Sequence, residues 1–158
     1  MKRYLAPLIA LPLILAACSE QTKPQDAPAN EGPVISYTDA FVMAPIAGRD
    51  VTMGGIEISV SGGDVHLMGA TSPIATSVET HTMAMDGDTM RMRPVEGWQI
   101  ADGETLDLDR GKDHLMIFGL TETIAPGDTV NITLSFHVEG REEPLMLEAE
   151  AEVRGRGQ

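Results

Sequence analysis

Histidine and methionine are the side chains of this sequence whose types and spacing could do chemistry. The chain of 158 residues contains ten methionines and four histidines. Four of the methionines follow His81 closely, at Met83, Met85, Met90 and Met92. Imidazole nitrogen and thioether sulfur are neutral ligands that suit soft transition metals, but methionine more often fills gaps in a hydrophobic core. Taken alone, this cluster favours packing over metal binding.

A longer spacing pattern links the cluster to a second pair of residues. His81 is followed after ten residues by Met92, after a further 21 by His114, and after one more by Met116. This H-x10-M-x21-H-x-M pattern resembles the signature of the PCuAC family of periplasmic copper chaperones. The resemblance implies a single copper(I) site made by His81, Met92, His114 and Met116. Met83 is then either an accessory ligand or a hydrophobic neighbour.

The resemblance extends over residues 50–153. The segments 67–73, 90–95, 114–120 and 126–136 are similar to those that surround the ligands and close the fold in this family. It implies a cupredoxin-like β-sandwich or barrel that passes copper(I) to a membrane terminal oxidase during cytochrome c oxidase assembly. Some members also carry a His- and Met-rich C-terminal extension, whereas residues 151–158 read AEVRGRGQ. No second copper site is therefore expected at that end.

The chemistry of the implied ligands agrees with copper(I). Residues two apart on a strand point to the same face, so His114 and Met116 can hold one ion while Leu115 packs inward. Two imidazoles and two thioethers offer a soft set without the oxygen ligands that calcium or magnesium prefer. A blue-copper centre requires a cysteine thiolate, and the single cysteine, Cys18, lies in a predicted lipidation motif. We therefore interpret the copper as cargo.

The remaining candidates have plainer interpretations. His66 and His137 fall outside the spacing pattern and are expected to be surface or hydrogen-bonded histidines. Met85 and Met90 flank an Asp-Gly-Asp turn and are expected to pack, although they could attract copper during transfer. Trp98 is the only tryptophan and is expected either in the core or as a lid over the site.

The elements that must position these side chains are predicted to be strands. Short runs of alternating apolar and polar residues recur between turn signals, and no long stretch keeps the spacing of an amphipathic helix. The predicted strands cover residues 56–60, 65–68, 78–85, 90–93, 105–109, 114–118, 129–138 and 145–153. We expect one all-β domain over residues 34–153, an antiparallel sandwich or barrel, followed by a short tail at 154–158.

The N-terminal region predicts export and a lipid anchor. Residues 1–17 have a basic start and a short apolar stretch, as in a secretory signal peptide. The sequence Leu15-Ala16-Ala17-Cys18 resembles a bacterial lipobox, in which the cysteine is acylated. Residues 18–33 read as a flexible tether. These features predict a periplasmic lipoprotein, and Ser19 after the cysteine favours the outer membrane where one exists.

Composition excludes several functions. A net charge of −13 argues against nucleic acid as a partner, because nucleic-acid binding relies on Lys and Arg. No nucleophile with a base, redox cysteine pair or carboxylate constellation is visible, so an enzyme is not expected. The predicted partners are a membrane, through the lipid, and a copper-accepting oxidase subunit or assembly factor, with the chain as a monomer. A copper buffer without a dedicated acceptor and a metal-free structural lipoprotein remain alternatives.

Overall fold

The computed structural model describes residues 32–157, so the predicted signal peptide, the lipidation site Cys18 and most of the tether lie outside the described residues. Within residues 32–157 the chain is all β. Its strands are β1 (Val34–Met43), β2 (Val51–Ser61), β3 (Val65–Thr71), β4 (Ala75–Asp86), β5 (Thr89–Pro94), β6 (Trp98–Ile100), β7 (Thr105–Leu108), β8 (His114–Leu120), β9 (Thr129–His137) and β10 (Leu145–Arg154). No helix long and apolar enough to cross a bilayer occurs in this part of the chain.

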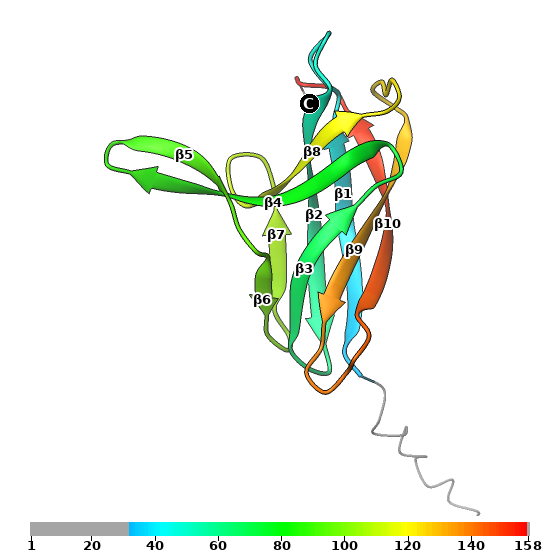
Figure 1. The fold of residues 1–158 in the computed structure, drawn as a ribbon. Coiled ribbons are helices and arrows are strands. Elements are labelled where there is room, and N and C mark those ends of the chain that lie inside the picture. The colour runs from blue at the N-terminus through cyan, green and yellow to red at the C-terminus, as the bar shows by residue number, and fades with distance from the viewer. Residues whose placement is uncertain (1–31, 158) are drawn as a thin grey trace, which may run out of the picture.

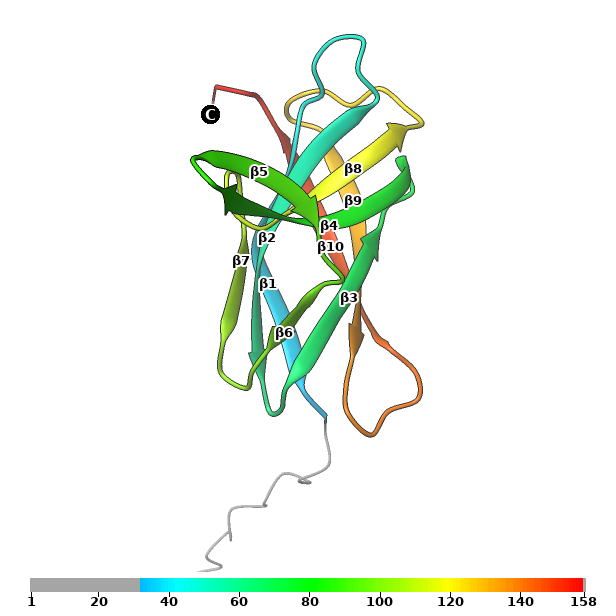
Figure 2. The ribbon, with the colours of Figure 1, turned by 60° about the vertical axis from the view of Figure 1, so that its left-hand side comes forward.

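Most of the strands close into a barrel, which Figures 1 and 2 show from two sides. The hydrogen-bonded order runs β4-β8-β2-β1-β10-β9-β3, and a further pairing of β3 with β4 joins the ends. Neighbours in this ring are antiparallel except for β1 and β10, which run parallel. Strand β7 adds to β2, β6 to β3 and β5 to β4. Closure removes the exposed edges that an open sheet would present.

The barrel interior contains the hydrophobic core. Strand β9 alternates buried and more exposed residues as the sequence predicts, with Val130, Ile132, Leu134 and Phe136 all facing inward. The largest fully buried side chains come from several strands around the ring, and include Phe136, Ile56, Leu67, Leu115 and Ile117. Burial of each such side chain contributes on the order of 1.5–3 kcal/mol to folding. The core therefore fixes the strands from which the candidate ligands project.

Two strands were not among those predicted, and the structure explains the difference. In β1, the pairing with β2 shifts between Thr38 and Phe41, and Asp39 has a φ of 50°. A bulge of this kind changes which residues face the core, so the regular two-residue alternation that identifies a strand is lost. Strand β6 is only three residues long, too short for any periodicity to be visible.

The β4–β5 hairpin projects from the barrel (Figure 1). The first part of β4 pairs with β8 up to His81, and its last part, from His81 to Asp86, pairs with β5. Strand β5 is exposed along its whole length and pairs with β4 at the end of the strand order. The predicted Asp86-Gly87-Asp88 turn connects the two strands, with Gly87 at a φ of 64° that glycine adopts readily.

Candidate metal centre

The four implied ligands lie on three neighbouring strands and share one face. His81 on β4 is directly opposite His114 on β8 and directly opposite Pro94 on β5. Residues directly opposite in an antiparallel pair project to the same side, as do residues two apart on one strand. Met92 on β5 and Met116 on β8 therefore join the two histidines on the outer face, while Leu115 is fully buried on the inner face, as predicted.

His114 is oriented by the turn that precedes β8. Its Nδ1–H donates to the carbonyl oxygen of Lys112 at 2.7 Å. Backbone hydrogen bonds connecting Asp109 with Lys112 and Asp113 hold this turn together. The Lys112 ammonium also pairs with Asp107, whose carboxylate raises the pKa of Lys112 above its usual value. With Nδ1 protonated, the neutral ring carries its lone pair on Nε2.

That lone pair faces a sulfur atom. His114 Nε2 lies 3.1 Å from Met92 Sδ. A thioether has no proton to donate. When the His114 ring is neutral, Nε2 and the sulfur therefore both present lone pairs, and no hydrogen bond joins them. A cation placed beside both atoms would be bound by them, because ligand bonds of about 2.0–2.3 Å to nitrogen and sulfur leave the two donors only a few ångströms apart.

His81 offers the second nitrogen. Its Nε2 lies 2.9 Å from Glu79 Oε2, and a proton on Nε2 would donate to that carboxylate. The other nitrogen, Nδ1, is buried and has no hydrogen-bond partner among the described residues. Burying a polar atom without a partner is costly. An ion bound at Nδ1 would remove that cost, so this atom fits a ligand role.

The spacing of the two rings is compatible with one shared ion. The ring centroids of His81 and His114 are 6.1 Å apart, and two imidazoles that bind one ion through bonds of about 2 Å have centres roughly 5–6 Å apart. No three His, Cys, Asp or Glu side chains gather into a metal-binding group within residues 32–157. Methionine sulfur is thus the donor available to complete a set that begins with these imidazoles.

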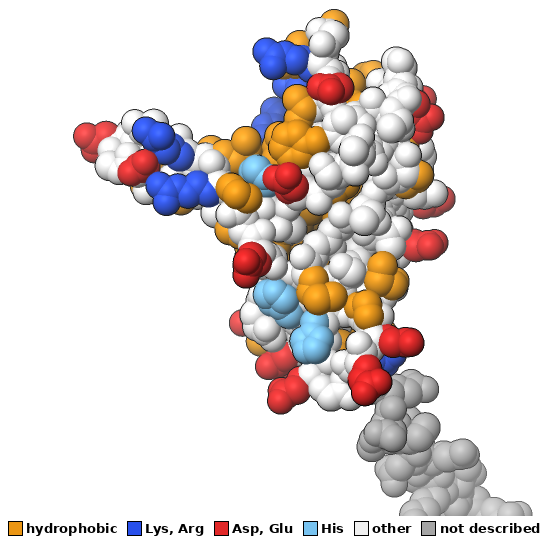
Figure 3. All heavy atoms as spheres, in the orientation of Figure 1, with side chains coloured by type: hydrophobic (Ala, Val, Ile, Leu, Met, Phe, Trp, Pro, Cys, Tyr) orange, Lys and Arg blue, Asp and Glu red, His pale blue; other side chains and the backbone are white. Residues whose placement is uncertain are grey.

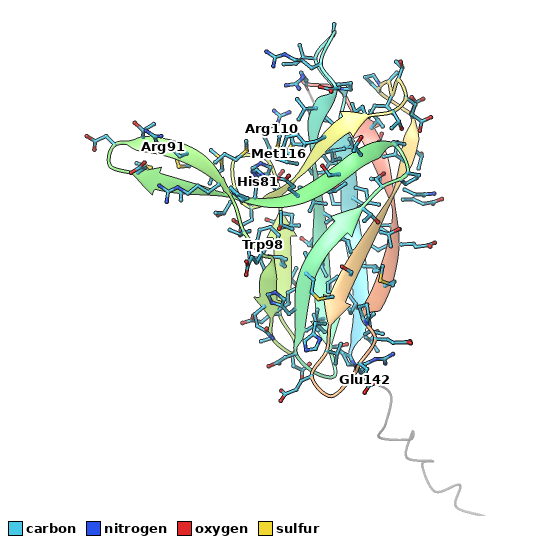
Figure 4. The ribbon with its side chains drawn as sticks, in the orientation of Figure 1. His81, Arg91, Trp98, Arg110, Met116 and Glu142 are labelled. Carbon is cyan, nitrogen blue, oxygen red and sulfur yellow. The ribbon has the colours of Figure 1, made fainter. Side chains whose placement is uncertain are left out.

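Met116 lies on the far side of the histidine pair from Met92. It is directly opposite Glu79 on β4 and Met53 on β2, and diagonal to His81, within the reach of a long side chain. Figure 4 shows Met116 and His81 close together near the point where the β4–β5 hairpin leaves the barrel. Met53 and Met116 also line an open pocket of about 260 Å³. The thioether side of the centre is therefore reachable from solvent.

Burial divides the centre into two halves. His81 and His114 are 7% and 4% exposed, whereas Met92 is 46% exposed. Met83 is directly opposite Met92 and half-buried, so it borders the centre on the hairpin side. The histidines are thus enclosed by the protein, whereas Met92 is open to solvent.

The other sequence candidates lie elsewhere. His66 and His137 are directly opposite each other on β3 and β9, beside an open pocket of about 240 Å³ that Asp64 and Glu139 also line. Trp98 on β6 packs against the core while half-buried, in agreement with the first of its two interpretations.

Three features of the centre were not predicted from the sequence. They are the carboxylate of Glu79, the carbonyl of Lys112 and the thioether of Met53. The turn before β8 brings the Lys112 carbonyl to the centre, and the pairing of β2 with β8 brings Met53. Neither arrangement produces a local pattern in the sequence. Glu79 precedes His81 by two residues, and that i, i+2 spacing on a predicted strand was the one available signal.

Comparisons with known proteins agree with the predicted fold and family. The family model described as "Putative lipoprotein LpqE-like" matches residues 35–144. "Putative lipoprotein Lxx21020" of Leifsonia xyli subsp. xyli (strain CTCB07) is 29% identical over 121 residues, which cover 76% of this chain and 72% of that protein. These two matches concern lipoproteins.

Solved structures provide the second comparison. The copper-bound PCuAC domain from PmoF2 superposes with a TM-score of 0.62 at 17% identity, covering 77% of this chain and 92% of that domain. The copper(I) form of DR1885 from Deinococcus radiodurans superposes with a TM-score of 0.58 at 28% identity, covering 89% of both chains. The predicted single all-β, cupredoxin-like domain is confirmed.

The family match covers well over half of the chain, and the structural neighbours are PCuAC domains. The chain therefore belongs to the LpqE-like lipoprotein family, which is of the PCuAC type.

Proposed function

We propose that this protein binds one copper(I) ion through His81, Met92, His114 and Met116 and delivers it to an acceptor at the membrane. The observation that carries the proposal is the arrangement at His114. The Lys112 carbonyl holds Nδ1, and Nε2 is left 3.1 Å from Met92 Sδ. The copper(I)-bound DR1885 structure, at 28% identity, supports the choice of metal and oxidation state.

The electrostatics of the centre suit a singly charged ion. Imidazole and thioether are neutral ligands, so copper(I) bound to them carries a net charge of +1. The Glu79 carboxylate, half-exposed and hydrogen bonded to His81, lies beside the centre and offsets this charge. Hydrogen bonds from ligand histidines to carboxylates and backbone carbonyls orient the rings and raise their basicity in metal sites. Glu79 and Lys112 would play these parts.

The two halves of the centre suggest a direction of transfer. Since the histidines are buried and Met92 is 46% exposed, an acceptor's ligands would replace thioethers first and imidazoles last. Such ligand exchange needs no protein unfolding. We further propose that the acceptor is a membrane terminal oxidase subunit or an oxidase assembly factor. A lipid on Cys18 would keep the protein at the membrane of the cell envelope, close to that acceptor.

Anaerobic titration with copper(I) against a chromophoric competitor, followed by metal analysis, tests the binding step. One tightly bound copper(I) per chain is expected. A chain that retains no copper against the competitor would reject the proposal, and copper(II) or zinc bound more tightly would reject the choice of cargo.

Oxidase activity in a deletion strain tests the delivery step. At limiting copper, we expect the strain to lose oxidase activity and to recover it with the intact gene but not with a His114→Ala gene. Normal oxidase activity together with increased copper sensitivity would instead identify a copper buffer.

A further inference from the structure

The outer half of the β4–β5 hairpin has two chemically different faces. Met83 is opposite Met92 and Met85 is opposite Met90, so four thioethers share one face. The other face carries Arg91 opposite Ala84 and Arg93 opposite Thr82, and both arginines pair with Asp86 at the end of β4. Figure 4 labels Arg91 on this hairpin, and Figure 3 shows the basic side chains gathered there.

Packing does not account for the methionine face. Met85 is 62% exposed and Met90 is 52% exposed, and strand β5 contacts β4 without adding to the core. Methionine usually fills irregular gaps in protein interiors, and these two side chains fill none. Their position continues the face that carries His81 and Met92.

We propose that Met85 and Met90, assisted by Met83, form a second and weaker copper(I) site that captures the ion and passes it inward. This inference rests on the proposed function. Side chains directly opposite across an antiparallel pair have Cβ atoms about 4.5–5.5 Å apart, and the unbranched methionine side chain is flexible. The Met85 and Met90 sulfurs can therefore converge on one ion, and thioethers select copper(I).

The distance inward is short. The Met83–Met92 pair lies two residues along the strands from the Met85–Met90 pair, or about 7 Å at the usual rise per residue. Met83 and Met92 can then exchange for the outer sulfurs one ligand at a time. No electron or proton moves, because copper stays in the same oxidation state and all of these ligands are neutral. Charge does not oppose the movement, since the hairpin's Asp86 and Asp88 balance Arg91 and Arg93.

The outer site must be the weaker one. It offers two or three thioethers in an exposed position, whereas the inner set adds two buried imidazoles. Weak binding with rapid exchange is what a capture site requires, because an ion held as tightly outside as inside would not move on.

Methionine-methyl NMR of the full-length chain in detergent tests the proposal. The chain, labelled with 13C at its methionine methyl groups, is titrated anaerobically with copper(I) supplied as its acetonitrile complex. The first equivalent should shift the methyl signals of Met92 and Met116. Between one and two equivalents, those of Met85 and Met90 should follow, with an affinity at least tenfold lower.

A matched pair of variants isolates the outer site. The double variant Met85→Leu, Met90→Leu keeps the side-chain volume but removes the sulfurs. It should lose the second ion, keep the first with an affinity within twofold, and load the first at least threefold more slowly from a copper(I) donor. The control, Met68→Leu with Met146→Leu, changes two exposed methionines on the barrel and should behave as the unmodified chain does.

The outcomes separate this inference from the proposed function. If Met92 and Met116 respond and Met85 and Met90 do not, the second site is wrong and the proposed function stands. Equal responses from Met68 and Met146 would mean that copper(I) binds any exposed thioether, which also overturns the inference. An unchanged loading rate in the double variant overturns the capture role. If no methionine methyl responds, both proposals fail.

Discussion

The barrel and the β4–β5 hairpin are both built from β-strands, but they differ in how many of their side chains are buried. In the barrel, strands bury one face in the core, and β9 and β10 do so with nearly every second residue buried. In the hairpin, β5 buries nothing. Strand β4 belongs to both regions, and His81 lies where its pairing with β8 ends. The comparison shows that the core residues and the candidate metal ligands lie on opposite faces of the same strands, and that the candidate metal centre lies where the two regions join.

The largest expected effect is on the barrel side of the centre. Leu115 lies between His114 and Met116 but is fully buried. Replacing a buried leucine by alanine typically costs about 2–5 kcal/mol of unfolding free energy. Leu115→Ala should lose that amount in urea unfolding followed by circular dichroism, yet still bind one copper(I) while folded. A loss of unfolding free energy below about 1 kcal/mol would mean that Leu115 contributes little to the core. A folded variant that no longer binds copper would mean that the core residue and the metal ligands are not independent.

The next effect is on binding. His114→Ala removes one of two imidazoles, and should raise the dissociation constant for copper(I) by tenfold or more, or about 1.4 kcal/mol for each tenfold change. His137→Ala is the control, because His137 is an exposed histidine on β9, paired with His66 rather than with the centre. Competition titration measures both variants. Equal losses in the two variants would mean that histidines in general, rather than this pair, bind the metal.

A smaller change in affinity is expected when the positioning of His81 is altered. Glu79 hydrogen bonds His81 Nε2 and is half-exposed. Glu79→Ala should therefore weaken copper(I) binding by about tenfold, the lower limit for residues that hydrogen bond to metal ligands. Glu79→Gln, which retains an oxygen acceptor, should recover part of the loss. If both variants bind as the unmodified chain does, the carboxylate does not position the ring.

The smallest effect concerns the far side of the barrel. The Arg154 guanidinium, hydrogen bonded to Asp39, holds the pKa of that carboxyl below its usual value of 3.8. Because this pKa is lowered on folding, the pair's contribution to stability is present above pH 3.8 and is lost as the pH falls through the lower, folded value.

Asp39→Asn removes this contribution while keeping a residue that tolerates positive φ. The variant should be slightly less stable than the unmodified chain at neutral pH, and the two should converge in strong acid. Urea unfolding at several pH values measures this difference, and copper(I) affinity should not change. A stability difference that is the same at every pH would show that the ion pair contributes nothing.

The sequence predicted those parts of the molecule that depend on local patterns. The alternation of Val130, Ile132, Leu134 and Phe136 identified β9, and the Asp86-Gly87-Asp88 turn identified the hairpin. The turn also fixes which β5 residue faces which β4 residue, so the placement of Met92 beside the histidine strand could be expected. The spacing from His81 to Met116 predicted membership of a PCuAC-type family, and the family match confirms that prediction.

The remainder depends on contacts between distant parts of the chain. The positive φ of Asp39 interrupts the alternation of β1, so that strand was invisible. The burial of His81 and its pairing with His114 arise from the register between β4 and β8, which no local pattern encodes. The same register brings Glu79 beside Met116, and the pairing of β2 with β8 adds Met53. These are the residues that sequence reasoning missed.

X-ray absorption spectroscopy at the copper edge tests the central claim most directly, because it identifies the atoms bound to the metal. The full-length chain loaded with one equivalent of copper(I) should show nitrogen and sulfur neighbours together, in the equal proportion that His81, His114, Met92 and Met116 would supply. His114→Ala should reduce the nitrogen share and leave the sulfur. A first shell of sulfur alone would mean that copper is held by the hairpin methionines, and a shell without sulfur would mean that Met92 and Met116 are not ligands; either result would contradict a centre at the junction of barrel and hairpin.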